Sequence, residues 1–313
     1  MVTTLQTGPV TLSPARATER PRRRLRSRHL AGFLCLLPFL AVNLLVILGP
    51  SIATLWYSLT DWNGLGPATY IGLQNYRDLT HDQNFREAFQ HVIIWTCFFL
   101  TVPIAMGLLG SFLLSQIHRG QMLFRLLYFI PYTIASVVNA SMWKNIFDTR
   151  KGIFAQLDKL GVPGMDHISI FGNTRNALWG VAWVDNWHWW GFLVVVFLAA
   201  MQTVDQELYD AVKLDGGSRW REFRDVTIPG ILPTLIFILL LTIIASLLVF
   251  DYIYIITQGG PAGSTEMVGT LLYKQAFELF EAGYAAAMGV TMTFLSLLIM
   301  LGYRALQRRG WEV

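Results

Sequence analysis

The sequence is poor in charged residues, which make up 14% of the chain, whereas hydrophobic residues make up 54%. An ordinary soluble domain carries about 25% charged residues. Together with a mean hydropathy of +0.45, this composition indicates a protein that crosses a membrane several times and argues against a soluble enzyme. The net charge of +4 does not indicate nucleic-acid binding, because the basic residues concentrate at the termini and in the loops.

Cysteine is scarce as well. The two cysteines, Cys35 and Cys97, lie in apolar runs and have no neighbouring cysteine or histidine cluster. This placement is typical of small buried hydrophobic residues and argues against a structural disulfide or a zinc site.

The chain also lacks the common nucleotide-binding and catalytic motifs. The phosphate-binding pattern G-x-x-x-x-G-K-[ST] does not occur, and the similar stretch GGPAGST has no lysine. The six histidines are scattered, and no Ser–His–Asp set or metal triad is recognisable. We therefore expect that the chain is not an enzyme and carries no cofactor and no metal of its own.

Six apolar runs are long enough for membrane helices, which need about 20 mostly apolar residues. They cover residues 31–59, 88–117, 122–147, 177–202, 229–257 and 283–306. Prolines such as Pro103 and Pro131 lie inside them, and we expect kinks at these positions. The sequence predicts an all-α polytopic membrane protein with six transmembrane helices in one domain, residues 31–306.

Lysine and arginine predict the orientation. Most of them fall in the tail 1–30, the loop after the second run, the segment 203–231 and the C-terminus. Six spans place all four regions on one side, which must be the cytoplasm, so the prediction is N-in and C-in. The tail 1–30 is expected to be disordered, and residues 307–313 form a cytoplasmic tail. The first run is longer than a signal-peptide core and has no A-x-A site, so we expect an uncleaved helix.

One polar segment, YDAVKLDGGSRWREFRDVTIPGILP, interrupts the apolar pattern after the fourth run. Its first part alternates as an amphipathic helix does, with apolar Leu208, Ala211, Val212 and Leu214 among charged Glu207, Asp210, Lys213 and Asp215. We expect Gly216 and Gly217 to end this helix, Ser218 to cap a second short helix, and Pro229 to end that one. The pattern alone fits a plain connector, a helix on the bilayer surface or a helix in the groove of a partner protein.

This segment resembles the cytoplasmic EAA loop of the permease subunits of bacterial ATP-binding-cassette importers. That loop reads roughly E-A-A, two residues, D-G-A, then an aromatic residue and I-x-x-P-x-x-x-P. The matching residues here are Asp210, Ala211, Val212, Asp215, Gly216, Gly217, Phe223, Val226, Pro229 and Pro233. The stretches DWNGLGPATYIGLQNYRDL, LLYFIPYTIASVVNASMWKNIF and FDYIYIITQGGPAGSTE also look like the maltose- and glycerol-phosphate-type first permease of the carbohydrate-uptake branch. The resemblance runs from Phe33 to Arg304.

The resemblance implies a type I importer permease fold in the bacterial cytoplasmic membrane. It implies import of a sugar, either a disaccharide or an oligosaccharide, with a glycerol-phosphate-type solute as the alternative. The partners would be a second homologous permease, two copies of an ATPase subunit that binds ATP and Mg, and an extracytoplasmic solute-binding protein. That binding protein would dock on the outer loops, around residues 61–87 and 258–282, and no nucleic acid is involved.

By the same resemblance, seven residues form the coupling helix that docks on the ATPase: Asp210, Ala211, Val212, Leu214, Asp215, Gly216 and Gly217. This chain departs from the family pattern at three of them. Asp210 is one methylene shorter than the glutamate of the motif, and Val212 and Gly217 replace alanines. The acidic charge and the turn glycine are kept, so the departures concern how the loop fits its partner.

The fourth run contains polar and aromatic residues at membrane depth, which are functional candidates. Sugars stack on aromatic rings and hydrogen-bond through hydroxyls, and the family lines its solute cavity from the fourth and fifth helices. The predicted cavity residues are Asn186, Trp187, His188, Phe192, Ser246 and Asp251. An interfacial aromatic belt is the alternative for the tryptophans, and a structural hydrogen bond is the alternative for Asp251. None of the six is an arginine, which favours an uncharged solute.

Two rival classes predict other features. A secondary transporter that works without ATP would show an inverted repeat and buried proton-relay acids in both halves, and neither is recognisable here. A structural membrane scaffold would not need the polar residues of the fourth run.

Overall fold

The structure is a computed structural model that describes residues 34–117, 119–165 and 168–307. The chain divides into two compact units, Met1–Ala53 and Thr54–Val313. The predicted tail 1–30 and all but the first residue of the tail 307–313 lie outside the described residues.

The first long helix, Leu34–Tyr57, begins in the first unit. It contains a π-helical turn, η1 (Asn43–Leu48), and continues as α2 (Gly49–Tyr57). The wider turn comes directly before Pro50, where the ring would clash with the carbonyl group one turn back in a regular helix. The first predicted membrane helix is therefore helical over Leu34–Tyr57, with a π-helical turn before Pro50.

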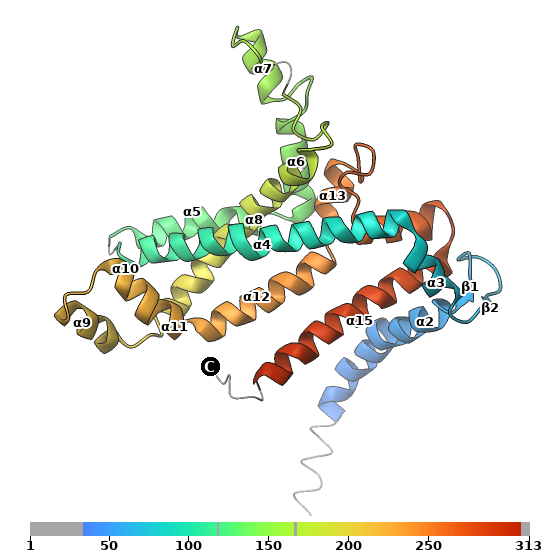
Figure 1. Cartoon of the computed structure of the whole chain (residues 1–313), viewed down its shortest axis with the longest axis horizontal. Helices are drawn as coiled ribbons and strands as arrows, with labels where there is room; N and C mark the ends of the chain where they lie inside the picture. The colour runs from blue at the N-terminus through green and yellow to red at the C-terminus, as the bar shows by residue number, and fades with distance from the viewer. Residues whose placement is uncertain (1–33, 118, 166–167, 308–313) are drawn as a thin grey trace, which may run out of the picture. The chain divides into compact units, whose positions relative to one another are not determined.

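The second unit is mostly helical, with one short antiparallel hairpin (Figure 1). Its remaining elements are β1 (Thr60–Asp61), β2 (Thr69–Tyr70), α3 (Gln74–His81), α4 (Gln83–Ser115), α5 (Gln121–Thr133), α6 (Ser136–Ile146), α7 (Ile153–Lys159), α8 (Ala177–Met201), α9 (Gln206–Leu214), α10 (Arg219–Glu222), η2 (Phe223–Thr227), α11 (Ile228–Gly230), α12 (Leu232–Leu247), α13 (Asp251–Ile256), α14 (Val268–Tyr273), η3 (Lys274–Glu278) and α15 (Ala282–Gln307).

Among the described residues, four helices are long and apolar enough to cross a membrane, namely Leu34–Tyr57, α4, α8 and α15. Two bent pairs bring the number to six if each pair counts as one span. The helical, multi-span architecture is confirmed, and the count of six remains a prediction.

The third predicted span is a broken helix. α5 and α6 meet at an angle of 91°. Pro131 lies in the last turn of α5, and Ile134 directly after the helix has an extended backbone. The expected kink is therefore a full break, whereas α4 continues through Pro103 as one helix.

The prediction of one helix over residues 229–257 is wrong. α12 ends at Leu247, and α13 begins after a break of three residues. α13 is held on α6, because Ser136 Oγ donates to Asp251 Oδ2 at 2.6 Å and Asn139 Nδ2 donates to Tyr252 Oη at 3.0 Å. These tertiary hydrogen bonds favour a new helix direction over continuation of an apolar run.

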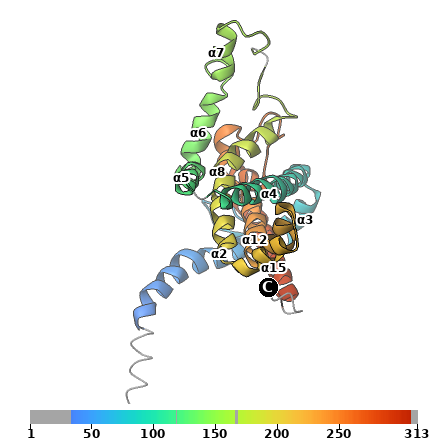
Figure 2. The same cartoon turned by 90° about the vertical axis from the view of Figure 1, so that its left-hand side faces the viewer.

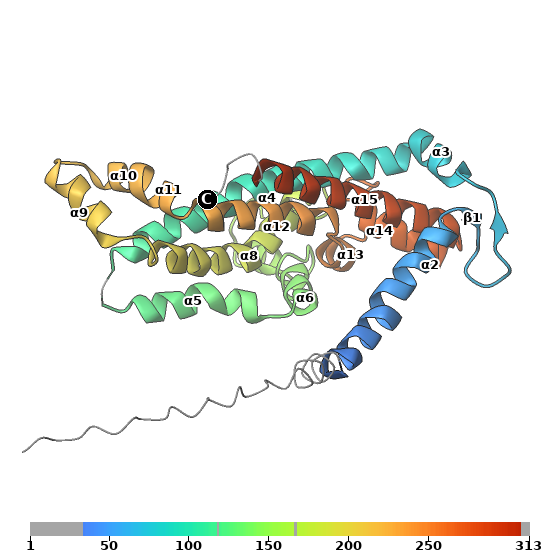
Figure 3. The same ribbon diagram turned by 90° about the horizontal axis from the view of Figure 1, so that it is seen from below.

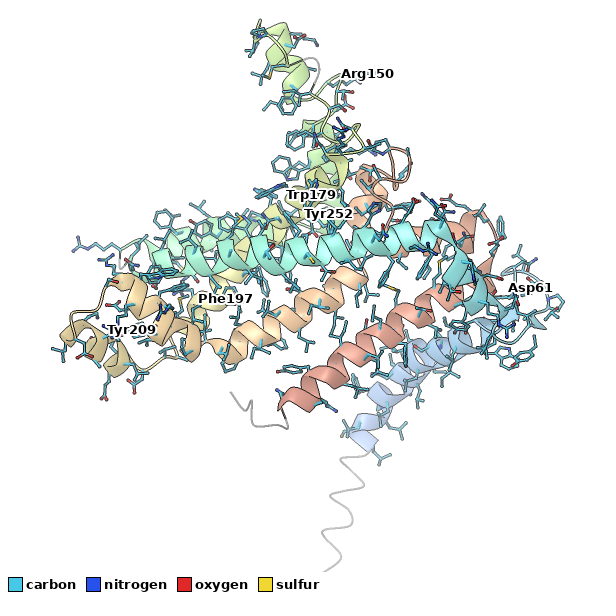
Figure 4. The ribbon with its side chains drawn as sticks, viewed as in Figure 1. Asp61, Arg150, Trp179, Phe197, Tyr209 and Tyr252 are labelled. Carbon is cyan, nitrogen blue, oxygen red and sulfur yellow. The ribbon has the colours of Figure 1, made fainter. Side chains whose placement is uncertain are left out.

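Glycines allow α4, α5 and α8 to pack closely. A Cβ on Gly107 of α4 would lie 2.7 Å from Leu193 Cβ of α8. A Cβ on Gly191 of α8 would lie 1.9 Å from the Tyr128 carbonyl oxygen of α5. Small residues at such crossings are typical of membrane helix packing. The fully buried Phe197, labelled in Figure 4, lies in the same layer with Ile104 of α4 and Ile238 of α12.

Two polar segments of the second unit lie at its opposite ends. The segment α9–α11 is at one end, and the β1–β2 hairpin with α3 is at the other (Figures 1 and 3). α7 stands away from α4, α8 and α12 (Figure 2). The two loops expected to receive the binding protein adjoin each other, because residues 62–65 of the first and Ala276, Phe277 and Phe280 of the second line one cavity. Directly after the second loop, the Gly283 amide donates to the Trp62 carbonyl at 2.8 Å.

Candidate functional site

The EAA-like segment, residues 203–231, folds as two short helices joined by a turn, as the sequence predicts. α9 begins after Asp205, whose side chain accepts a hydrogen bond from the Glu207 amide at 3.1 Å. The next helix begins after Ser218, whose Oγ accepts from the Arg221 amide at 3.4 Å. Ordinary capping chemistry therefore sets both helix starts.

Gly216 makes the turn between these helices. Its φ is +71°, a left-handed conformation that glycine adopts without strain. The Gly216 amide donates to the Lys213 carbonyl at 3.0 Å, and the Gly217 amide donates to the Val212 carbonyl at 2.9 Å. This pair of bonds is the Schellman ending of a helix. No atom lies within 4 Å of the place a Cβ would take on Gly216, so the backbone conformation and not space requires glycine there.

Gly217 is required for a different reason. A Cβ on Gly217 would lie 2.4 Å from Val212 Cγ1 and 2.8 Å from the Val212 carbonyl oxygen. The family pattern has alanine at both positions. Here the larger Val212 takes space that a methyl group on residue 217 would need, so the two departures are complementary.

Gly217→Ala is expected to strain the turn, because overpacking of a tight contact costs about 1–3 kcal/mol. Trypsin should then cleave faster at Lys213 and Arg219, which flank the turn. The matched control is Val212→Ala with Gly217→Ala, which removes the side-chain part of the clash and should slow cleavage again. Equal cleavage of the single and double variants would refute the complementarity.

The expectation that Pro229 ends the second helix is wrong. The helical path continues from α10 through the π-helical η2 and through Pro229 to Gly230. The chain then bends by 70° into α12. Pro229 lies just after the wider turn of η2, which accommodates a proline ring that would clash with the preceding turn of a regular helix.

The outer face of α9 is exposed. α9 has no buried residue, and the side chain of Leu214 is 88% exposed at its end. Lys213 Nζ pairs with Asp210 Oδ1 at 3.2 Å, and both groups are largely solvated. α9 therefore presents a bare leucine among mostly acidic side chains.

The candidate cavity residues lie on two faces of α8. His188 and Ser246 line a cavity of about 170 Å³ between α4, α8 and α12. Asn186 and Trp187 line a cavity of about 510 Å³ between α4, α6 and α8. A helix turns 100° per residue, so neighbouring positions such as 187 and 188 point in different directions.

More polar side chains line the smaller cavity than the larger one. Asp185, His188, Thr242, Ser246 and Tyr252 contribute carboxyl, imidazole and hydroxyl groups to it. Within the described part of the chain, Thr242 Oγ1 has no hydrogen-bond partner. A solute hydroxyl group can satisfy such an atom.

The larger cavity is walled mainly by aromatic rings. Trp183, Trp187 and Trp190 project into it from α8, and Trp143 projects from α6. Asn186 is buried, and its Nδ2 lies 3.4 Å from Met106 Sδ of α4. This arrangement suits an apolar face better than a hydroxyl-rich one.

The two other predicted residues line neither cavity. The ring of Phe192 stacks on Tyr132 with centroids 4.5 Å apart. Asp251 accepts the hydrogen bond from Ser136, which is the structural alternative named for it. The sequence did not single out Tyr132, Tyr252 and Gly191, although Tyr252 directly follows the candidate Asp251 in the FDYIY stretch.

Known proteins are similar to this chain in sequence. The family model of the binding-protein-dependent transport system inner membrane component matches residues 103–311. The trehalose/maltose transport system permease protein of Thermococcus litoralis is 28% identical over 268 residues, which cover 85% of this chain and 90% of that protein. The diacetylchitobiose uptake system permease protein of Streptomyces coelicolor is 29% identical over 310 residues, which cover 95% of this chain and 88% of that protein.

A solved structure supports the same fold. A chain of the bacterial alginate ABC transporter, in complex with an alginate pentasaccharide-bound periplasmic protein, superposes with a TM-score of 0.80. The match covers 93% of this chain and 98% of the other at 20% identity. The family model covers more than half of the chain, and the EAA-like segment lies inside the matched region. The chain therefore belongs to the family of inner membrane components of binding-protein-dependent transport systems.

Proposed function

We propose that this chain is a permease subunit of a sugar importer in the bacterial cytoplasmic membrane, with six spans and both termini in the cytoplasm. The observation that carries the proposal is the exposed helix–turn–helix of the EAA-like segment, with Leu214 bare at its end. An exposed helix–turn–helix with an apolar side chain at its tip is a surface suited to binding another protein.

Charge favours a protein partner over the bilayer surface. Asp205, Glu207, Asp210 and Asp215 surround α9, with Lys213 as the one basic residue in that stretch. The cytoplasmic leaflet is negatively charged and attracts basic segments. An acidic helix is therefore repelled by the bilayer and suits a groove with basic groups, such as a cleft on an ATPase subunit.

The energy for transport would come from outside this chain. The sequence carries no phosphate-binding loop, so two ATPase subunits with ATP and Mg would supply the power stroke through the EAA-like segment. A second permease would complete the pathway in domain 31–306. The binding protein would deliver the solute at the adjoining outer loops, and closure of the ATPase pair would open the cavity outwards.

A sugar is the solute class that the cavities and the relatives support. The two relatives named above belong to uptake systems for trehalose, maltose and diacetylchitobiose. The polar groups of the smaller cavity can bind hydroxyls, and the aromatic rings nearby can cover sugar faces. The described residues that line either cavity include no arginine or lysine, which disfavours a glycerol-phosphate solute.

Uptake by cells that lack this chain, with and without its restoration, tests the proposal. The probes are radiolabelled maltose, trehalose, diacetylchitobiose and glycerol 3-phosphate, each with and without depletion of cellular ATP. ATP-dependent uptake of a sugar upon restoration is expected. Uptake that persists after ATP depletion, or uptake of glycerol 3-phosphate alone, would reject the proposed sugar importer.

Trp187→Ala and Phe192→Ala are each expected to raise the KM of that uptake several-fold. Trp187 lines the larger cavity, and Phe192 supports Tyr132 beside the smaller one. The matched control is Trp179→Ala, on the same helix and outside both cavities (Figure 4). Uptake kinetics like those of the parent protein in both variants would exclude these residues from the solute path.

A further inference from the structure

α9 is set apart from the helices behind it. A cavity of about 530 Å³ separates it from the ends of α4 and α8, and Gln116, Gln202 and Gln206 are among the residues that line it. Because α9 buries none of its residues, it is not held by a packed core. Any movement of α9 must reach the membrane helices through a small number of contacts.

One side-chain hydrogen bond crosses from α9 to the next helices. Tyr209 Oη lies 3.1 Å from Thr227 Oγ1 (Tyr209 is labelled in Figure 4). Thr227 Oγ1 lies 3.3 Å from the Glu222 carbonyl and donates its proton there. Since a hydroxyl has one proton, Tyr209 is the donor to Thr227. Within the described part of the chain, the other side-chain hydrogen bonds of α9 stay inside its own turn.

Thr227 lies where the helix is irregular and buried. It is the last residue of the π-helical η2 and is 2% exposed. π-Helical turns are frequent at functional sites. The hydroxyl of Thr227 donates to the carbonyl of Glu222, at the start of this turn.

From Thr227 the contacts lead into α12. The Ile231 amide donates to the Thr227 carbonyl at 3.0 Å, and the Leu235 amide donates to the Ile231 carbonyl at 2.9 Å. Ile231 is fully buried beside Phe197 and Ile238. The 70° corner is therefore hydrogen-bonded on both sides and packed, so α11 and α12 move together.

The corner at Gly216 is the weak point of this chain of contacts. Gly216 and Gly217 connect α9 to α10 by a turn without a side chain on either residue. The two hydrogen bonds of the turn join the glycines to α9 only, so the direction of α10 relative to α9 depends on glycine backbone, which has the widest conformational freedom. A hydrogen bond between α9 and η2, away from the Gly216 turn, holds the two helices in a fixed orientation relative to each other.

We infer that Tyr209 is the positioning residue of the EAA-like segment, and that its hydrogen bond to Thr227 makes α9 move as one body with α12. The inference rests on the proposed function, in which an ATPase subunit moves α9. α12 carries Thr242 and Ser246 of the smaller cavity. This hydrogen bond between Tyr209 and Thr227, the brace, thus connects the surface that contacts the ATPase to the solute cavity. The brace itself contacts neither the ATPase subunit nor the solute.

The test measures the movement of α12 in the complete transporter. In a chain whose Cys35 and Cys97 are replaced by serine, Ser246→Cys reports access to the smaller cavity through its rate of labelling by a fluorescent maleimide. The rate is measured in proteoliposomes without nucleotide and with ATP plus vanadate. The parent reporter is expected to show a nucleotide-dependent change in rate, and Tyr209→Phe and Thr227→Val are each expected to lose most of it.

Three controls separate the brace from a general defect. Thr227→Ser keeps the hydroxyl and should keep the change in rate. Tyr303→Phe removes a hydroxyl that is bonded to Gln307, away from α9, and should also keep it. Tyr209→Phe combined with Thr227→Val should have no further effect, because both changes remove the same bond.

The outcomes distinguish the brace from the proposed function. A nucleotide-dependent change in Tyr209→Phe equal to that of the parent would overturn the brace, with the ATPase contact intact. Loss of the ATPase subunit from the Tyr209→Phe complex would also overturn it, since the brace acts behind the contact. A parent reporter that does not respond to nucleotide would overturn the proposed function itself.

Discussion

Gly216→Pro is expected to abolish solute uptake while the protein still inserts into the membrane. Proline fixes φ near −65°, whereas Gly216 has a φ of +71°. Proline also removes the amide that donates to the Lys213 carbonyl at 3.0 Å. The turn therefore cannot form, and α9 is redirected away from the place where an ATPase subunit would receive it.

The measurement is ATP-driven uptake, together with the amount of the chain in the membrane fraction and the ATPase subunit that copurifies with it. Gly161→Pro is a closely matched control. Gly161 has a φ of +83°, its amide donates to the Asp158 carbonyl at 2.9 Å, and no atom lies near its missing Cβ. It lies after α7, so uptake should be largely retained. Normal uptake by Gly216→Pro would refute a coupling role for the turn.

Leu214→Glu is expected to release the ATPase subunit from the complex. The side chain is 88% exposed in the isolated chain, so the substitution removes no internal packing. Burial of a leucine in a partner pocket is worth about 1.5–3 kcal/mol, which corresponds to roughly a 10- to 150-fold change in affinity. A carboxylate in the same pocket adds a desolvation penalty.

Copurification of the ATPase subunit with tagged Leu214→Glu protein measures this effect. Leu160→Glu provides the comparison, because Leu160 is 79% exposed at the end of α7, at a distance in sequence from the EAA-like segment. It should retain the ATPase subunit in full. Equal retention by both variants would mean that Leu214 does not enter the partner.

The sequence predicts the EAA-like segment well because its signals are local. The cap residues Asp205 and Ser218 and the left-handed turn at Gly216 act within a few residues of themselves. The break after Pro131 could be expected in kind, since proline disrupts a helix, but not its angle of 91°. That angle depends on how α5 and α6 pack on other helices.

The arrangement of the candidate cavity residues could not be predicted from the sequence. α8 is apolar around most of its circumference, so its pattern does not reveal which face meets which neighbour. Trp187 and His188 line different cavities because they face different neighbours, α6 and α12, which come from distant parts of the sequence. The end of α12 at Leu247 likewise depends on hydrogen bonds from Ser136 and Asn139, more than 100 residues away in the sequence.

The complementary fit of Val212 and Gly217 affects how this protein can be recombined with its relatives. A chimera that takes the first helix of the loop from an alanine-bearing relative and keeps Gly217 would leave a gap behind the turn. The opposite exchange would combine Val212 with a methyl group that has no room at 2.4 Å. Crossover points in chimeras that are meant to pair with a different ATPase subunit should therefore lie outside residues 212–217, so that both residues come from the same parent.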